Sequence, residues 1–178
     1  YIGEGGRGQF LHSGGTNTAA GGIYIGYGPG GEGTYELGGS AELSASDLYV
    51  GYKGTGTFRR TGGTLNLSGK MYVGKDGGSG TVELAGSDLT VPEIRLGEGG
   101  DGSITHTAGR LDVTGGIYLG YYVPYWGFYE FGDEAELATG TLYNGYVGGG
   151  DITQRGGNAV GGLVVVDNGQ RCARGRVV

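Results

Sequence analysis

Residues 118–131 hold the densest group of side chains that could bind a ligand. The segment reads YLGYYVPYWGFYEF and contains eight aromatic residues. We expect Tyr121, Tyr122, Tyr125 and Trp126 to project from a loop, where large side chains with one polar end stack on sugar rings or on protein surfaces. The alternative is a loop that folds these aromatic side chains over an open part of the core.

Tyrosines also recur along the chain at intervals of 23 to 25 residues. One set comprises Tyr24, Tyr49 and Tyr72, and a second comprises Tyr27, Tyr52, Tyr121 and Tyr146, with Lys75 and Glu98 at the intervening positions. If successive repeats stack, each set forms a column, so the sequence predicts an aromatic face for a glycan or another copy of the chain. The alternative is that tyrosines align because aromatic neighbours stabilise a sheet.

The two histidines, His12 and His106, occupy equivalent positions four repeats apart. Four stacked repeats at about 4.8 Å each separate them by about 19 Å, which is too far to share a metal ion or a proton. In the other repeats this position holds Leu37, Arg60, Leu84, Phe131 and Gln154. We therefore interpret it as a coil edge that accepts any side chain.

Carboxylates recur in the glycine-rich segments, at Glu4, Glu32, Asp76, Glu98 and Asp101. The stretch GGDGS at 99–103 resembles part of a calcium-binding nonapeptide, but the ligand aspartate is missing and the period differs. The charged positions rotate around the repeat, whereas a polysaccharide-cleaving site needs its acid and base on one face. We therefore predict no catalytic residue, no metal site and no cofactor, and we expect the protein not to be an enzyme.

Threonines form one short file at Thr34, Thr57 and Thr81. An ice-binding plane needs a flat and regular array of threonines, but Ser103, Phe128 and Asp151 interrupt this file. The pattern therefore argues against that function.

All these positions belong to a sequence repeat of 23 to 25 residues. Copies start at residues 1, 24, 49, 72, 95, 118 and 143. Each copy contains three short apolar runs of alternating pattern, and clusters of glycine, which accounts for 47 of the 178 residues, separate them. Since alternation indicates strands and glycine clusters indicate turns, we predict a right-handed parallel β-helix of about seven coils with three short strands per coil.

Alternation also predicts which side chains face inward. The I-Y-I strand turns its aliphatic pair inward, as in Ile23 and Ile25, and its central tyrosine outward. The T-Φ strand turns one residue inward, at Phe10, Tyr35, Phe58, Val82, Ile104, Tyr129 and Ile152. The L-x-L strand turns pairs such as Leu65 and Leu67 inward. In two copies the pair is shifted, to Ala41 with Leu43 and Ala135 with Leu137, so we expect a bulge or an altered corner there.

The recurrent Y-[IVL]-G-x-G-G-x-G-T-Φ-x-x-x-G-G-x-L-x-[LV] unit resembles the Gly-rich β-strand repeats of bacterial autotransporter passengers and related exported β-helical surface proteins. The resemblance covers about residues 1–163 and implies export, a β-helical stalk and a role in adhesion or biofilm. It carries over no catalytic residue. Residues 164–178, VVVDNGQRCARGRVV, depart from the pattern and form a degenerate coil, a cap or a tail.

The net charge of −6 and the lack of a basic stripe argue against binding to nucleic acid. No apolar run approaches the roughly 18 residues of a membrane-spanning segment. We therefore expect an extracellular or bacterial cell-surface structural or adhesive solenoid, either a segment of a longer surface protein or a self-assembling fibre subunit. Its expected partner is itself, end to end or laterally, or a surface polysaccharide bound around Trp126.

Overall fold

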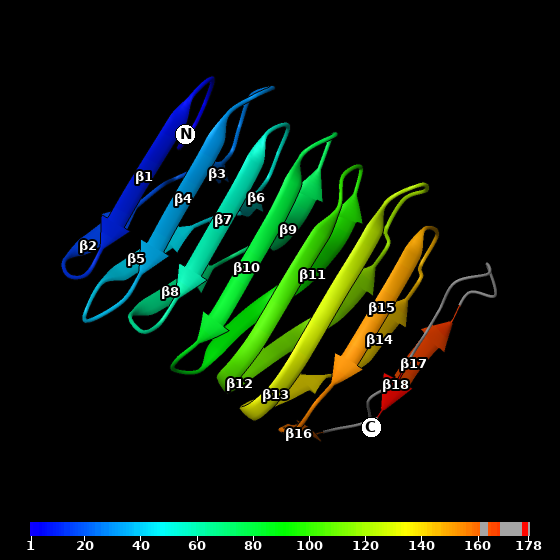
Figure 1. Cartoon of the computed structure of the whole chain (residues 1–178). Coiled ribbons are helices and arrows are strands. Elements are labelled where there is room, and N and C mark those ends of the chain that lie inside the picture. Colours follow the sequence, from blue (N-terminus) through cyan, green and yellow to red (C-terminus); the bar gives the residue numbers. More distant parts are fainter. Residues whose placement is uncertain (161–163, 168–175, 178) are drawn as a thin grey trace.

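A computed structural model describes residues 1–160, 164–167 and 176–177. These residues contain strands and turns but no helix, and the ladders between strands are parallel. The strands stack into a β-solenoid of about seven turns (Figure 1). In Figure 1 the strands in front run downward and those behind run upward as the coils advance from the N-terminal end, so the winding is right-handed. The predicted fold class is confirmed.

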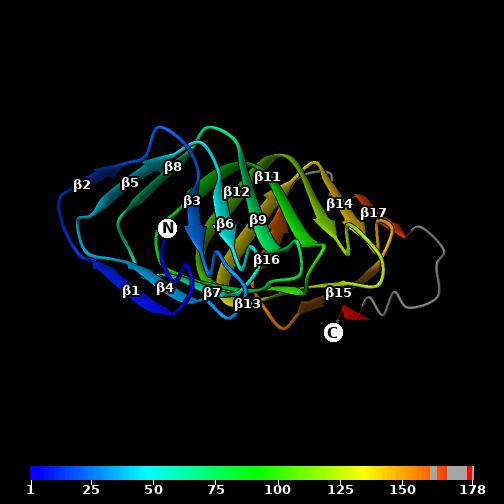
Figure 2. The same ribbon diagram turned by 90° about the horizontal axis from the view of Figure 1, so that it is seen from above.

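Three faces enclose the core (Figure 2). The first face contains β1 (Arg7–His12), β4 (Glu32–Leu37), β7 (Thr55–Arg60), β10 (Ser79–Ala85), the start of β12 (Gly102–Leu119), the start of β13 (Trp126–Thr139), β15 (Gly149–Gln154) and β18 (Arg176–Val177). The second face contains β2 (Thr16–Thr18), β5 (Glu42–Ala45), β8 (Thr64–Leu67), the start of β11 (Leu89–Glu98), the middle of β12, the end of β13 and β16 (Asn158–Val160). The third face contains β3 (Ile23–Ile25), β6 (Leu48–Val50), β9 (Lys70–Lys75), the ends of β11 and β12, β14 (Thr141–Asn144) and β17 (Val164–Asp167).

The prediction of three short strands per coil is too simple for the middle of the stack. There β11, β12 and β13 run continuously around corners over 10, 18 and 14 residues. The ladders shift register at these corners, between His106 and Ala108 for example, and a bulge of this kind lets pairing continue through a bend.

The core consists of columns of like residues, one residue from each coil. On the first face the inward column runs Phe10, Tyr35, Phe58, Val82, Ile104, Tyr129, Ile152 in register. All of them are buried except Phe10, which lies in the first coil. The aliphatic pairs of the third face, such as Leu48 and Val50, are also buried. The inward residues predicted by alternation are therefore confirmed on both faces.

The shifted pairs of coils two and six need a correction. Leu43 and Ala45 lie in register with Leu65 and Leu67, so the strand itself is not displaced, and Ala41 is an additional buried residue at its corner. In coil six, Leu137 is likewise in register with Leu111, after the bulge. One extra residue at this corner is offset at the next corner, and the two residues by which coils two and six exceed 23 lie in the first corner, before β4 and β13.

Glycines make the corners possible by allowing backbones of adjacent coils to touch. Gly51 has a φ of 72°, and a Cβ added there would lie 2.1 Å from the carbonyl oxygen of Ser79 in the next coil. Only glycine fits both the left-handed conformation and this contact. The β17 strand pairs with β14, so the solenoid extends four residues beyond the predicted boundary at 163, and the rest of 164–178 lies almost entirely outside the described residues.

Candidate binding surfaces

The predicted tyrosine columns exist on the third face. The rings of Tyr24 and Tyr49 stack with centroids 4.4 Å apart and planes within 2°, and those of Tyr49 and Tyr72 stack at 4.8 Å and 1°. Beside them, Tyr27 and Tyr52 stack at 5.3 Å and 5°. The ladder spacing brings the rings together because each tyrosine occupies the same register position in successive strands.

A second block of tyrosines continues both columns toward the C-terminal end. Tyr118 and Tyr143 stack at 4.6 Å, and Tyr121 and Tyr146 stack at 5.1 Å. Between the two columns the rings meet edge to face, at 72° for Tyr118 with Tyr121. Neighbouring rings therefore cover much of each ring face, and the rings are half-buried.

A charged junction joins the two blocks of tyrosines. The guanidinium of Arg95 replaces a ring in the first column, 4.3 Å from the ring centroid of Tyr121 and 5.8 Å from that of Tyr72. It also donates hydrogen bonds to Glu93 and, at 2.8 Å, to Glu98. In the second column Lys75 forms an ion pair with Glu98. We call the nine tyrosines of both columns and this junction the tyrosine strip.

The junction is electrostatically paired. Burial alone would lower the pKa of Arg95, but its hydrogen bonds with Glu98 and Glu93 raise that pKa above the ordinary value. Burial would raise the pKa of Glu93, but the hydrogen bonds from Arg95 and Lys70 outweigh it and lower that pKa. Both groups are therefore held in their charged forms.

The structure divides the predicted aromatic corner between two faces. Tyr121 belongs to the tyrosine strip, and the half-exposed ring of Tyr122 meets it edge to face at 4.9 Å. Tyr125 is half-buried, and its carbonyl accepts a hydrogen bond from the Gly149 amide. Trp126 is not a loop residue, because it begins β13 on the first face. Sequence reasoning thus named four residues that do not form one patch.

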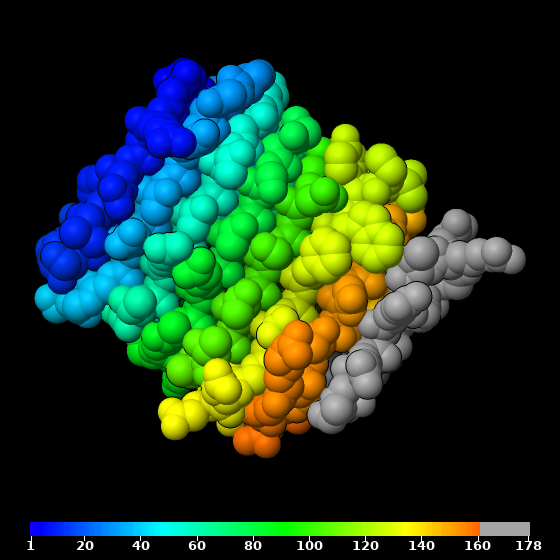
Figure 3. All heavy atoms as spheres, in the orientation of Figure 1, coloured from blue at the N-terminus to red at the C-terminus, as the bar shows by residue number. Residues whose placement is uncertain are grey.

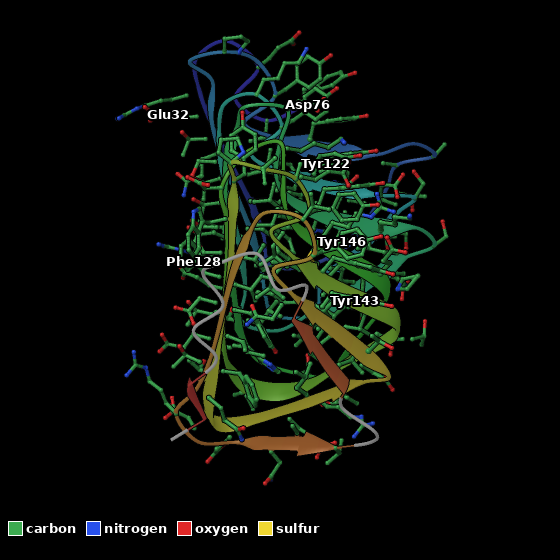
Figure 4. All side chains as sticks on the ribbon, turned by 90° about the vertical axis from the view of Figure 1, so that its right-hand side faces the viewer. Glu32, Asp76, Tyr122, Phe128, Tyr143 and Tyr146 are labelled. Atoms are coloured by element: carbon green, nitrogen blue, oxygen red, sulfur yellow. The ribbon has the colours of Figure 1, made fainter. Side chains whose placement is uncertain are left out.

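Trp126 forms a different pair, with Phe128. Their rings are within 13° of parallel with centroids 5.9 Å apart, and Phe128 is 43% exposed. The Trp126 ring covers Gly149 of the next coil, where a side chain would lie 2.4 Å from it. Figure 4 shows Phe128 on the side of the solenoid opposite Tyr122, Tyr143 and Tyr146. In Figure 3 bulky side chains from the yellow region, around residues 120–130, stand out from the rows of the first face.

A file of small hydroxyl side chains leads to this pair along the first face. Thr34, Thr57, Thr81 and Ser103 lie in successive coils in register with Phe128. A hollow of about 440 Å³ lies over the start of the file, between Gln9 and Thr57. Two ion pairs flank the file, Arg7 with Glu32 on one side and Arg59 with Glu83 on the other. The sequence predicted the file of threonines but not the hollow above it.

The position of the histidines is an interior column and not a tolerant coil edge, which corrects our interpretation. His12, Leu37, Arg60, Leu84, His106 and Phe131 are all buried. His106 places Nε2 2.9 Å from the Gly109 carbonyl and Nδ1 3.1 Å from the Tyr129 hydroxyl. A neutral ring that donates from Nε2 and accepts at Nδ1 satisfies both contacts. Burial lowers the pKa of His106.

The same arrangement occurs twice. His12 contacts the Gly15 carbonyl at 3.1 Å and the Tyr35 hydroxyl at 2.8 Å. His12 and His106 are 94 residues apart, as are Tyr35 and Tyr129, so the signal that could have revealed these pairs is an internal duplication of four coils.

Arg60 occupies the same column and bridges two coils. Its guanidinium donates to the carbonyls of Gly63 at 2.8 Å and Asp88 at 3.0 Å, and also to the Ser87 carbonyl. It lies at the edge of a hollow of about 690 Å³ on the second face, where β8 and β11 are not paired. Arg60 therefore ties together two coils at a gap in the wall.

No family model, curated protein or solved structure matches this chain. Within the described ranges, no three or more His, Cys, Asp and Glu side chains gather in a way that could hold a metal ion. The same part of the chain offers no helix with the length and apolar character that crossing a membrane requires.

Proposed function

We propose that this protein is a non-enzymatic structural or adhesive rod of the cell surface or extracellular space. The observation that carries the proposal is the packing of the rings within the tyrosine strip. Its ring faces are packed against one another from coil to coil, at 4.4 to 5.3 Å, so the strip stabilises the stack. The rings are half-buried, so their outer edges face away from the stack.

Other contacts also run along the axis. Arg7 with Glu32, Arg59 with Glu83, and Arg155 with Glu130 each join one coil to the next. Each exposed pair contributes little because water screens it, but a row of them opposes separation of the coils. A rod of this construction resists bending and pulling along its length, which is what a stalk or a fibre unit requires.

Antibody labelling of intact source cells tests the proposed location and role together. We expect equal labelling of intact and permeabilised cells, and we expect beads coated with the purified chain to adhere to cells or to one another. Labelling that appears only after permeabilisation would contradict the location. Coated beads that remain dispersed and bind no cells would contradict the adhesive role.

A second function, recognition of a polysaccharide, is favoured by the Trp126 and Phe128 pair at the end of the hydroxyl file. Aromatic rings pack on sugar faces, and hydroxyl side chains exchange hydrogen bonds with sugar hydroxyls. Coils repeat every 4.8 Å or so, which is close to the length of one sugar in an extended chain, so a glycan along the file could meet one side chain per coil. The acidic surface favours a neutral glycan.

Retention on immobilised neutral glycans tests this second function. Trp126→Ala and Phe128→Ala should each abolish retention if the pair is the platform. Tyr122→Ala is the matched control, because Tyr122 is also exposed at this corner but lies on the strip side. Equal loss with all three variants, or no retention of the unmodified protein, would reject the glycan function and leave the rod proposal untouched.

A further inference from the structure

We propose that the tyrosine strip is a self-complementary surface on which a second copy of the chain binds in antiparallel orientation. The inference rests on the proposed rod function and specifies its partner. It follows from the order of charges and rings along six successive strands of the third face, β3, β6, β9, β11, β12 and β14.

The centre of the strip lies between β9 and β11, and the two strands carry opposite charges. In register, Lys70 is beside Glu93, Tyr72 is beside Arg95, and Lys75 is beside Glu98. Consider a half-turn about an axis that runs between β9 and β11, parallel to these strands and perpendicular to the solenoid axis. It brings β9 of one copy opposite β11 of the other. Lys70 then faces Glu93 of the second copy's β11, Lys75 comes to the position of the buried Glu98, and each Tyr72 faces an Arg95.

The same half-turn matches the tyrosines on both sides of the centre. Tyr49 comes opposite Tyr118, and Tyr52 comes opposite Tyr121. At the ends Tyr24 comes opposite Tyr143. On both sides of the centre aromatic rings face aromatic rings, and at the centre no charge faces a like charge. Pairs of this kind on two copies are what an isologous interface requires.

A parallel arrangement lacks this complementarity. It places β9 opposite β9, so Lys70 and Lys75 of one copy face lysines of the other. It also places β11 opposite β11, where Glu93 and Glu98 face glutamates. Like charges in close opposition disfavour a wrong partner or orientation. The charge order therefore selects the antiparallel arrangement.

Lys70, Glu93 and Lys75 remain partly accessible although they are paired within the chain, whereas Glu98 is buried. Lys70 and Glu93 form an ion pair at 3.0 Å with side chains that are 33% and 21% exposed. In the complex each Lys70 would lie between two Glu93 carboxylates, one of its own chain and one of the second copy. A square of alternating charges results, so the internal ion pairs do not have to break.

The size of the strip predicts weak pairing. Six strands span about 24 Å along the axis and the strip is about 15 Å wide, so two copies bury roughly 700 Å², well below the roughly 1,200 Å² of ordinary specific interfaces. We expect pairing of single chains at about 0.1–1 mM and stronger association where many strips are aligned.

Cysteine trapping tests the orientation, in a Cys172→Ser background. The double variant Tyr24→Cys, Tyr143→Cys should form disulfide-linked dimers at least about tenfold faster than a control, because pairing raises the local thiol concentration. The two positions are about 24 Å apart in one chain, too far for an internal disulfide. Thr34→Cys, Asp151→Cys is the matched control, with the same coils but on the first face.

Each outcome decides the inference. Neither single variant should cross-link alone, whereas a mixture of the two should. Fast cross-linking of Tyr24→Cys by itself would show parallel pairing and overturn the proposal. Equal rates for the strip pair and the control pair would show random collision and also overturn it.

Charge exchange supplies a second measurement, by sedimentation at high protein concentration. Lys70→Glu should abolish pairing, and Lys70→Glu with Glu93→Lys should restore it, because the exchange keeps opposite charges together within and between chains. Failure of the double variant to restore pairing, in a chain that folds normally, would overturn the proposal. A chain that labels intact cells but shows no pairing would lose this inference and retain the proposed rod function.

Discussion

Four glycine to alanine substitutions separate the two reasons for which this fold needs glycine. Gly140 has open space around it and an ordinary φ, and Gly30 has open space but a φ of 74°. Gly56 has an ordinary φ, but a Cβ there would lie 2.2 Å from the Gly51 amide nitrogen of its own coil and 2.4 Å from the Ile25 carbonyl oxygen of the adjacent coil. Gly51 combines a φ of 72° with a Cβ 2.1 Å from the Ser79 carbonyl oxygen.

These geometries give an ordered series of changes in the free energy of unfolding. Gly140→Ala should be neutral or stabilise by up to about 1 kcal/mol, since alanine restricts the unfolded chain. Gly30→Ala should destabilise by about 1–2 kcal/mol through left-handed strain alone. Gly56→Ala should destabilise by at least about 3 kcal/mol, because backbone of the adjacent coil must move. Gly51→Ala adds strain to the clash and should exceed about 4 kcal/mol.

Equilibrium unfolding in urea, followed by far-ultraviolet circular dichroism, measures the series. The comparison of Gly51→Ala with Gly30→Ala is the decisive one, because the two residues share the same φ and differ in coil contact. Equal destabilisation by these two substitutions would refute the reasoning that backbone contact between coils sets the requirement for glycine. The slope of the transition must stay constant for the comparison to hold.

Two further predictions concern side chains of the interior and of the strip. The free energy of unfolding should fall as the pH drops below about 6.5, by up to about 1.4 kcal/mol per pH unit, because the unfolded chain binds a proton at His106 while burial lowers the pKa of the folded ring. Urea titrations at several pH values should show a smaller fall for His106→Gln. This variant copies the contact of Gln154 with the Gly157 carbonyl. Tyr49→Leu should destabilise by about 1–3 kcal/mol because Tyr49 stacks on rings at both sides, whereas Tyr49→Phe keeps both stacks and should cost less than half as much by thermal unfolding.

Alternation in the sequence was sufficient to predict the core because its cause is local. In a strand, successive side chains point to opposite sides, so Tyr35, Phe58 and Val82 had to face inward once the strand was recognised. Stacking of repeats then placed Tyr24, Tyr49 and Tyr72 in one column. Both inferences need only the strand period and the repeat length.

The corners could not be predicted in this way because they depend on carbonyl directions. From the sequence we expected His106 and Arg60 at an exposed coil edge, because polar side chains are seldom buried without a hydrogen-bond partner. Their partners are the carbonyls of Gly109 and Gly63, three residues later, where φ is positive. Similarly, the length of the loop before Trp126 decides whether Trp126 lies in the loop or on β13. In the structure Trp126 pairs with Gly149 and therefore belongs to β13.

The two blocks of tyrosines follow from the four-coil duplication. Tyr24, Tyr27, Tyr49 and Tyr52 each have a tyrosine 94 residues later, and Glu4 has Glu98. The offset is constant although coil lengths vary, so the longer coils two and six are corresponding members of two four-coil units. Lys75 belongs to the last coil of the first unit and Glu98 to the first coil of the second. Their ion pair therefore lies at the seam between the units.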